Sequence, residues 1–131
     1  MNQLNIYTDG ASRGNPGPAS VGVIIKNRKG EILGRWKKSI GVTTNNQAEY
    51  EALIYGLEKA KGLKAEEANC FLDSNLAVEQ INRRYKIKDA NLGRLFIKIW
   101  NLSQSFKKIN FHYLPREKNK EADRLANQAF H

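Results

Sequence analysis

The chain has 131 residues, of which 40% are hydrophobic and 27% charged, and this is the size and composition of one globular domain with a single core. No apolar run approaches about 18 residues, so we expect no membrane contact, and the first residues lack the pattern of a secretory signal. The only cysteine, Cys70, excludes an intrachain disulfide and a cysteine-built zinc site, which favours a cytoplasmic location.

The net charge gives the first indication of function. Lys and Arg number 22 against 13 Asp and Glu, which leaves a formal charge of +9. A small domain this basic commonly binds a polyanion, and nucleic acid is the commonest one. The alternative is a basic surface that serves only solubility.

The first half of the chain predicts a hairpin of strands. A strand over residues 4–8 alternates apolar and polar positions and ends at Asp9. Residues 10–18 contain three glycines and two prolines, which predicts a rigid turn region with neither helix nor strand. Strands over 21–25 and 32–38 follow, and a tight turn at 27–30 joins them antiparallel.

Helices and strands alternate in the rest of the chain. We expect a helix over 46–62, a strand over 69–72, helices over 75–82 and 92–105, a strand over 108–114 and a final helix from residue 119 onward. A hairpin followed by crossovers predicts an α/β fold, with a five-stranded mixed sheet and helices on both faces. We expect residues 1–131 to form one domain.

Acidic residues interrupt this pattern at four places. Asp9 and Asp73 each follow an apolar strand, where ligand sites gather in open α/β sheets, although Asp is also a good turn residue. Glu49 lies beside the apolar face of its helix, or else completes a capping box with Asn46 as N-cap. Asp123 lies in the first turn of the last helix, where the helix dipole also favours an acid.

Packing against one sheet could bring these four acids together. Clustered carboxylates repel one another, and divalent cations relieve that repulsion. A set of oxygen ligands without cysteine or paired histidines suits Mg²⁺ or Mn²⁺ better than Zn²⁺. Two such ions about 4 Å apart are a known apparatus for attack at phosphorus. An acidic metal site in a basic protein therefore favours phosphodiester chemistry.

Four segments, in the same order, resemble the motifs of type 1 ribonucleases H. They are residues 7–18 (YTDGASRGNPGP), 43–50 (TTNNQAEY), 72–74 (LDS) and 119–127 (NKEADRLAN). The resemblance extends over the whole chain and implies a ribonuclease H-like fold. It also implies endonucleolytic hydrolysis of the RNA strand of RNA/DNA hybrids, with 3′-hydroxyl and 5′-phosphate products.

The resemblance assigns roles to individual residues. Asp9, Glu49, Asp73 and Asp123 match the family's catalytic carboxylates, which hold two Mg²⁺ ions, and Mn²⁺ is expected to substitute. The positions that match substrate contacts are Gly10, Ser12, Asn15, Thr44, Asn45, Asn46 and Gln47. Short amides suit the shallow minor groove where RNA presents its 2′-hydroxyls. Local alternatives stay open, because Asn15 precedes Pro16 in a turn and the asparagines at 45 and 46 could cap a helix.

The chain departs from many family members in two places. Residues 81–98 leave no room for the basic helical insertion found there, so the chain resembles the handle-less archaeal and bacterial forms. Some archaeal members of this form also cut double-stranded RNA, so the resemblance allows double-stranded RNA as a second substrate. Arg116 stands where the family has a mobile-loop histidine; it can contact a phosphate or help to expel product, but it cannot exchange a proton near neutral pH.

Two other functions fit a domain of this kind. One is a module that binds hybrids without cutting them; the complete set of four acids argues against it, because acids without cations hinder binding of a polyanion. The other is a nuclease such as a junction resolvase or an exonuclease; the asparagine-rich segment argues against it, because it favours recognition of 2′-hydroxyls. We expect a monomer that acts on RNA/DNA hybrid and has no membrane partner.

Overall fold

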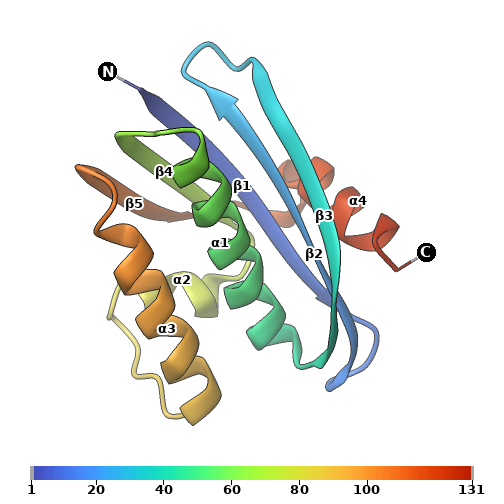
Figure 1. Ribbon diagram of the computed structural model, residues 1–131. Helices are drawn as coiled ribbons and strands as arrows, with labels where there is room; N and C mark the ends of the chain where they lie inside the picture. The colour runs from blue at the N-terminus through green and yellow to red at the C-terminus, as the bar shows by residue number, and fades with distance from the viewer. Residues whose placement is uncertain (1, 131) are drawn as a thin grey trace.

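The computed structural model describes residues 2–130, which form one five-stranded sheet and its helices (Figure 1). The strands are β1 (Gln3–Ser12), β2 (Gly17–Asn27), β3 (Ile32–Thr43), β4 (Glu67–Leu72) and β5 (Lys108–Tyr113). The α-helices are α1 (Asn45–Gly62), α2 (Asn75–Ile81), α3 (Ala90–Ser103) and α4 (Lys120–Gln128), and a short 3₁₀ helix, η1 (Arg116–Lys118), precedes α4. The predicted α/β fold with a five-stranded mixed sheet is confirmed.

The strands lie in the order β3-β2-β1-β4-β5. β1, β2 and β3 form an antiparallel meander, whereas β4 and β5 run parallel to β1. Parallel neighbours need a crossover, and the chain makes one through α1 and another through α2 and α3. β1 is therefore the central strand, with an antiparallel partner on one side and a parallel partner on the other.

Helices cover both faces of the sheet, as predicted. Figure 1 shows α1, α2 and α3 on one face and α4 on the other. The main core lies under α1, whose Tyr50, Leu53 and Leu57 are fully buried with Leu4 and Ile6 of β1. Among residues 2–130, no helix is long and apolar enough to cross a membrane.

The prediction of a strand-free turn over residues 10–18 was wrong. β1 continues to Ser12, and β2 begins at Gly17, so only residues 13–16 form the turn. The glycine at position 10 has a packing role: a Cβ there would lie 2.2 Å from the carbonyl of Ala48 in α1. Local composition favoured a turn, but pairing of Gly10 with Val21 keeps the backbone extended.

The start of α1 also differs from the capping-box interpretation. Thr44 is the N-cap residue, and its Oγ1 accepts a hydrogen bond from the backbone N–H of Gln47 at 3.2 Å. Asn46 therefore lies inside the helix, and Glu49 lies beyond the position that a capping box requires. The side chain of Glu49 is buried and has another partner, as described below.

Candidate active site

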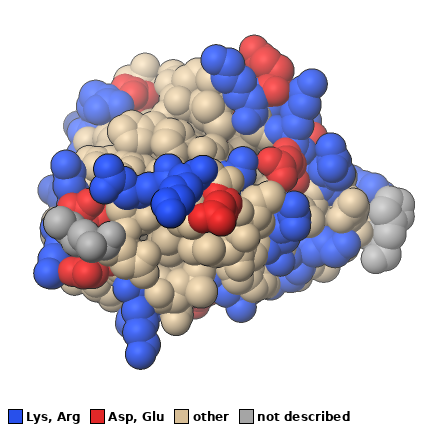
Figure 2. Space-filling view, turned by 90° about the horizontal axis from the view of Figure 1, so that it is seen from above, with Lys and Arg blue, Asp and Glu red and all other residues tan. Residues whose placement is uncertain are grey.

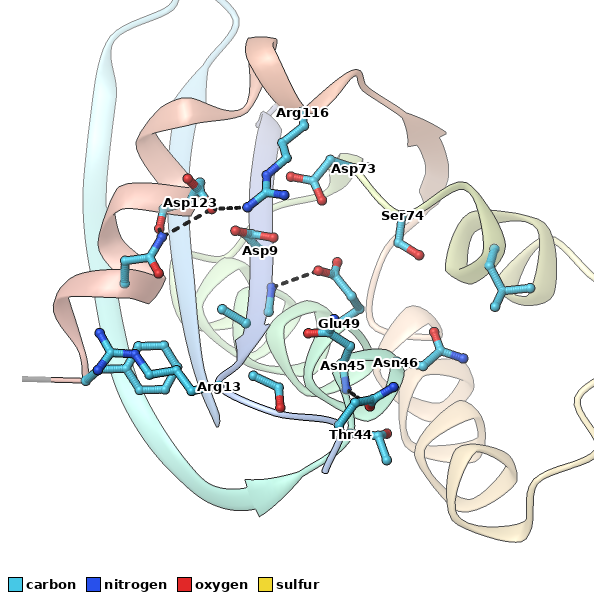
Figure 3. Close-up of a pocket in the computed structure, with 17 residues that line it drawn as sticks. Asp9, Arg13, Thr44, Asn45, Asn46, Glu49, Asp73, Ser74, Arg116 and Asp123 are labelled. Atoms are coloured by element: carbon cyan, nitrogen blue, oxygen red, sulfur yellow. Dashed lines mark hydrogen bonds and ion pairs between the residues drawn. The ribbon is translucent and has the colours of Figure 1, made fainter. Parts of the chain in front are cut away.

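Three of the four predicted acids converge at one place. Carboxylate oxygens of Asp9, Glu49 and Asp73 lie within 4.8 Å of one another. They come from β1, from α1 and from the loop after β4, and Figure 3 shows them facing one another. Residues 64 positions apart in the chain thus form a single acidic cluster, here called the carboxylate cluster.

Strand pairing brings the two aspartates together. β1 and β4 are parallel and in register up to Thr8 and Leu72, so Asp9 and Asp73 each directly follow the last paired residue of the two neighbouring chain segments. The rings of Tyr7 and Phe71, two residues earlier, are stacked with centroids 4.9 Å apart. Side chains two residues apart in a strand point to the same face of the sheet, so Asp9 lies on the same face as Tyr7.

A close approach of helix and strand brings Glu49 into the cluster. Pairing with β4 ends at Thr8, and the backbone N–H of Gly10 donates a hydrogen bond to Glu49 Oε1 at 3.2 Å. The absence of a side chain at Gly10 lets α1 lie this near. Glu49 is only 7% exposed, so its carboxylate is held in place by packing and by this hydrogen bond.

Asp123 lies at the edge of the same cleft, outside the tightest group. It belongs to α4, which packs closely on the sheet at Gly22, where no side chain intervenes. A Cβ at this position would lie 2.4 Å from the carbonyl oxygen of Ala122. Asp123 Oδ1 is 3.6 Å from the guanidinium of Arg116. The same oxygen accepts a hydrogen bond from Asn127 Nδ2 at 3.3 Å. Figure 3 shows Arg116 extending over the acids between Asp123 and Asp73.

The carboxylates raise one another's proton affinity. Burial raises the pKa of Asp9, and the nearby charges of Glu49 and Asp73 raise it further. Burial and Asp73 likewise raise the pKa of Glu49, which Arg116 and the Gly10 N–H lower in part. The pKa of Asp73 is also raised by burial, against an opposing hydrogen bond from Asn119.

The residues of the cluster suit a divalent cation. Glu49 Oε2 is buried and has no hydrogen-bond partner within the described residues. An orphaned carboxylate oxygen is costly unless a cation or a proton satisfies it. Because all the donors are carboxylate oxygens, the hard cations Mg²⁺ and Mn²⁺ fit them best.

The cluster lies in a cleft of about 650 Å³. The cleft is lined by all the predicted site residues except Gln47: Asp9, Gly10, Ser12, Asn15, Thr44, Asn45, Asn46, Glu49, Asp73, Arg116 and Asp123. Gln47 lies instead in a second groove of about 560 Å³, across the first turn of α1, together with Thr43, Arg94 and Lys98. The start of α1 therefore forms a ridge between two grooves.

The amides on this ridge are held by neighbouring side chains. Asn15 Oδ1 accepts a hydrogen bond from the backbone N–H of Asn45 at 3.0 Å, which ties the β1–β2 turn to α1. Asn46 Nδ2 donates to Gln80 Oε1 at 3.4 Å, and the hydroxyl of Tyr50 donates to the same oxygen at 2.8 Å. Gln80 is buried, so its hydrogen bond fixes the side chain of Asn46 from the protein interior.

Sequence reasoning missed two positioning residues, Gln80 and Asn119. Asn119 is 2% exposed; its Nδ2 donates to the backbone oxygen of Thr8 at 2.9 Å and to Asp73 Oδ2 at 3.0 Å. It thereby joins the start of α4 to β1 and to the carboxylate cluster. An asparagine before a helix is ordinarily a cap, and nothing local distinguishes this one.

Comparisons with known proteins agree with this geometry. The family model described as reverse transcriptase-like matches residues 7–129. The bifunctional protein Rv2228c of Mycobacterium tuberculosis is 45% identical over 125 residues, which are 95% of this chain and 34% of that protein. The chain thus spans about a third of that relative's length.

Two solved structures are similar over nearly their whole length. RNase H1 from the halophilic archaeon Halobacterium salinarum is 38% identical, with a TM-score of 0.96 over 98% of this chain and 97% of that one. LC11-RNase H1, solved in complex with RNA/DNA hybrid, is 43% identical, with a TM-score of 0.92 over 96% and 95% of the two chains. The family match and these relatives show that the chain belongs to the reverse transcriptase-like family, as one of its type 1 ribonuclease H members.

Proposed function

We propose that residues 1–131 act as one ribonuclease H domain that hydrolyses the RNA strand of RNA/DNA hybrids and leaves 3′-hydroxyl and 5′-phosphate ends. The observation that carries the proposal is the carboxylate cluster of Asp9, Glu49 and Asp73 in a cleft of a protein with net charge +9. A related protein, LC11-RNase H1, has been solved in complex with such a hybrid.

Two Mg²⁺ ions, or Mn²⁺ in their place, are the cofactors we propose. Asp9, Glu49 and Asp73 would hold them together with Asp123 at the edge of the cleft. Bound there, the ions supply charge for activating a water molecule and for stabilising the leaving 3′ oxygen. The protein's part is to hold the carboxylates in fixed positions, which the hydrogen bonds from Gly10 and Asn119 accomplish.

The hybrid is proposed to straddle the ridge at the start of α1. Asn45 and Asn46 lie on that ridge, and amides there can both donate to and accept from 2′-hydroxyls in the minor groove. The RNA strand would then lie in the cleft with the carboxylate cluster. The DNA strand would lie toward the second groove, where Arg94 and Lys98 offer positive charge and Gln47 an amide.

Arg116 is proposed to contact the RNA backbone beside the cluster. Its side chain is 78% exposed and lies 3.6 Å from Asp123, so it can exchange a carboxylate for a phosphate without leaving the cleft. An arginine keeps its proton near neutral pH, so it acts here through charge and hydrogen bonding. Arg116→Ala is expected to slow turnover by a modest factor.

Cleavage of labelled RNA/DNA hybrid, duplex RNA and duplex DNA, with Mg²⁺, with Mn²⁺ and with EDTA, tests the proposal. We expect metal-dependent cutting of the RNA strand of the hybrid and no cutting of duplex DNA. Asp9→Asn should abolish cleavage while retaining hybrid binding, because Asp9 interacts with each of the other three acids. Strong Mg²⁺-dependent cleavage by Asp9→Asn would contradict the role given to this residue.

The same assay separates the proposal from its rivals. Binding of the hybrid without cleavage in either metal would indicate a non-catalytic module. Cleavage of a four-way DNA junction in preference to the hybrid would indicate a resolvase. Cutting of duplex RNA at a comparable rate would add a second substrate and would leave the carboxylate mechanism unchanged.

A further inference from the structure

One cation in the cleft has no part in the function described above. Arg13 lines the cleft at its rim, and Figure 3 shows it and Arg116 on opposite sides of Asp9. Arg116 is paired with Asp123, whereas no carboxylate among residues 2–130 is within ion-pair distance of the Arg13 guanidinium. Its hydrogen-bond donors are therefore available to an anion that enters the cleft.

An aromatic ring holds this guanidinium in place. The Arg13 Cζ lies 4.2 Å from the centroid of the Phe130 ring, which is a cation–π distance. Phe130 is half-buried, follows α4 and lines the same cleft. Stacking on a ring leaves the edge of a guanidinium, where its N–H groups are, free to bind a phosphate.

The backbone on both sides of this contact is fixed. The N–H of Arg13 donates to the carbonyl of Pro18 at 2.8 Å, and Ser12 Oγ donates to the carbonyl of Thr43 at 3.1 Å. On the other side, the hydroxyl of Ser20 in β2 donates to the carbonyl of Ala126 and so ties down the end of α4. An arginine held from both sides loses little side-chain entropy when it binds a ligand.

We propose that Arg13, positioned by Phe130, binds a phosphate of the RNA strand at the end of the cleft away from Arg116. This inference rests on the proposed function, because it takes the polyanion in the cleft to be the RNA strand. The two arginines would then neutralise backbone phosphates on either side of the carboxylate cluster, where the acids themselves repel a polyanion.

The test compares Arg13→Ala and Arg13→Lys with Arg28→Ala, which removes an exposed arginine of the β2–β3 turn, outside the cleft. Hybrid affinity is measured in the Asp9→Asn background, so that the substrate survives, and kcat and KM are measured with Asp9 present. Arg13→Ala should weaken binding about 5- to 10-fold, raise KM by a similar factor and leave kcat nearly unchanged.

Two further readouts separate a phosphate contact from a structural role. The slope of log affinity against log salt should fall by about one in Arg13→Ala and stay unchanged in Arg28→Ala. Phe130→Ala should weaken binding in the same direction, and this effect should disappear in the Arg13→Ala background. Phe130→Tyr keeps a ring under the guanidinium and should bind as tightly as the parent.

Equal affinity and equal salt slope for Arg13→Ala and Arg28→Ala would overturn the inference, as would a loss of kcat with unchanged affinity. A protein that binds hybrid but does not cut it, and still shows the Arg13 effect, would refute the proposed function alone. A protein that cuts hybrid without any Arg13 effect would refute the inference alone.

Discussion

Two energetic costs add at Asp9: the residue is only 5% exposed, and its carboxylate has two other acids beside it. Both costs disfavour the charged form, and both fall on the folded state alone. Such an acid lowers the stability of the folded protein, and the same arrangement of acids attracts cations. At the scale of single residues, the active site therefore lowers the stability of the metal-free protein, and this has measurable consequences.

Asp9→Asn should stabilise the metal-free protein while abolishing cleavage. The amide needs neither a buried charge nor a proton, so it avoids the cost of keeping an acid beside Glu49 and Asp73, a gain of about 1–3 kcal/mol that raises Tm by roughly 3–12 °C in thermal unfolding with EDTA. Glu58→Gln, which neutralises an exposed acid of α1, is the matched control and should leave Tm almost unchanged. A lower Tm for Asp9→Asn than for the parent would contradict this account.

The pH dependence has a definite sign. The pKa values of Asp9 and Glu49 in the folded protein are raised above the ordinary 3.8 and 4.5. Below those values both states are protonated and no penalty exists; above them the unfolded chain releases protons that the folded protein retains, so stability falls as pH rises. The Tm gap between Asp9→Asn and the parent in EDTA should therefore widen from about pH 4 toward neutrality. A gap that narrows over this range would rule out the assignment.

Asn119 positions the carboxylate of Asp73 through a buried hydrogen bond. Asn119→Ala removes its hydrogen bonds to Thr8 and Asp73 from a buried site, which should cost about 2–3 kcal/mol in chemical denaturation. It should also lower kcat, because Asp73 loses a partner that holds it in place. The control is Asn101→Ala on the exposed face of α3. Equal effects of the two substitutions would show that the hydrogen bonds of Asn119 contribute neither to stability nor to catalysis.

At the scale of elements, local sequence predicted which segments fold into strands and helices but not how far they extend. The apolar alternation located β1, yet its last four residues are extended because β2 pairs with them. The glycine at position 10 suggested a turn, although its role is to admit α1. Thr44, and not Asn46, caps α1. The sequence could not distinguish them, because both are good N-cap residues and only the path of the folded chain decides between them.

The candidate site was predictable to a similar extent. Asp9, Glu49 and Asp73 were recognisable because acids interrupt apolar patterns, and their convergence follows from the parallel pairing of β1 and β4. The buried amides of Gln80 and Asn119 were not recognisable, because their partners are distant in the chain. Side chains that position others leave no periodic signal.

Contact between α4 and β2 should control both stability and activity. In Gly22→Ala the new methyl group would lie within 2.4–2.6 Å of the α4 backbone, so the helix that carries Asp123 must move away from the sheet. We expect a loss of about 1–3 kcal/mol and a reduced kcat. The matched change Gly93→Ala in α3 has open space, and it should stabilise the protein by about 0.5–1 kcal/mol without affecting cleavage. Unimpaired cleavage by Gly22→Ala would show that the position of α4 does not matter.

At the scale of the whole molecule, positive charge and the acidic cleft have to act together. Figure 2 views the end of the sheet where β1 begins, and there Lys and Arg side chains are interspersed with Asp and Glu. The second groove instead brings Arg94 and Lys98 of α3 near the ridge, with Glu51 as its one acid among the lining residues. If the DNA strand lies there, these two cations supply part of the affinity that the carboxylate cluster opposes.

Salt dependence tests this division of labour. Hybrid affinity, measured in the Asp9→Asn background, should fall steeply with salt, and the double variant Arg94→Ala/Lys98→Ala should reduce the log–log slope by about two because two phosphate contacts are lost. The pair Arg28→Ala/Lys29→Ala removes the same charge from the β2–β3 turn and should leave the slope unchanged. Equal slopes for the two double variants would mean that the protein's net charge, and not the second groove, attracts the hybrid. The position of the DNA strand would then have to be sought elsewhere on the surface.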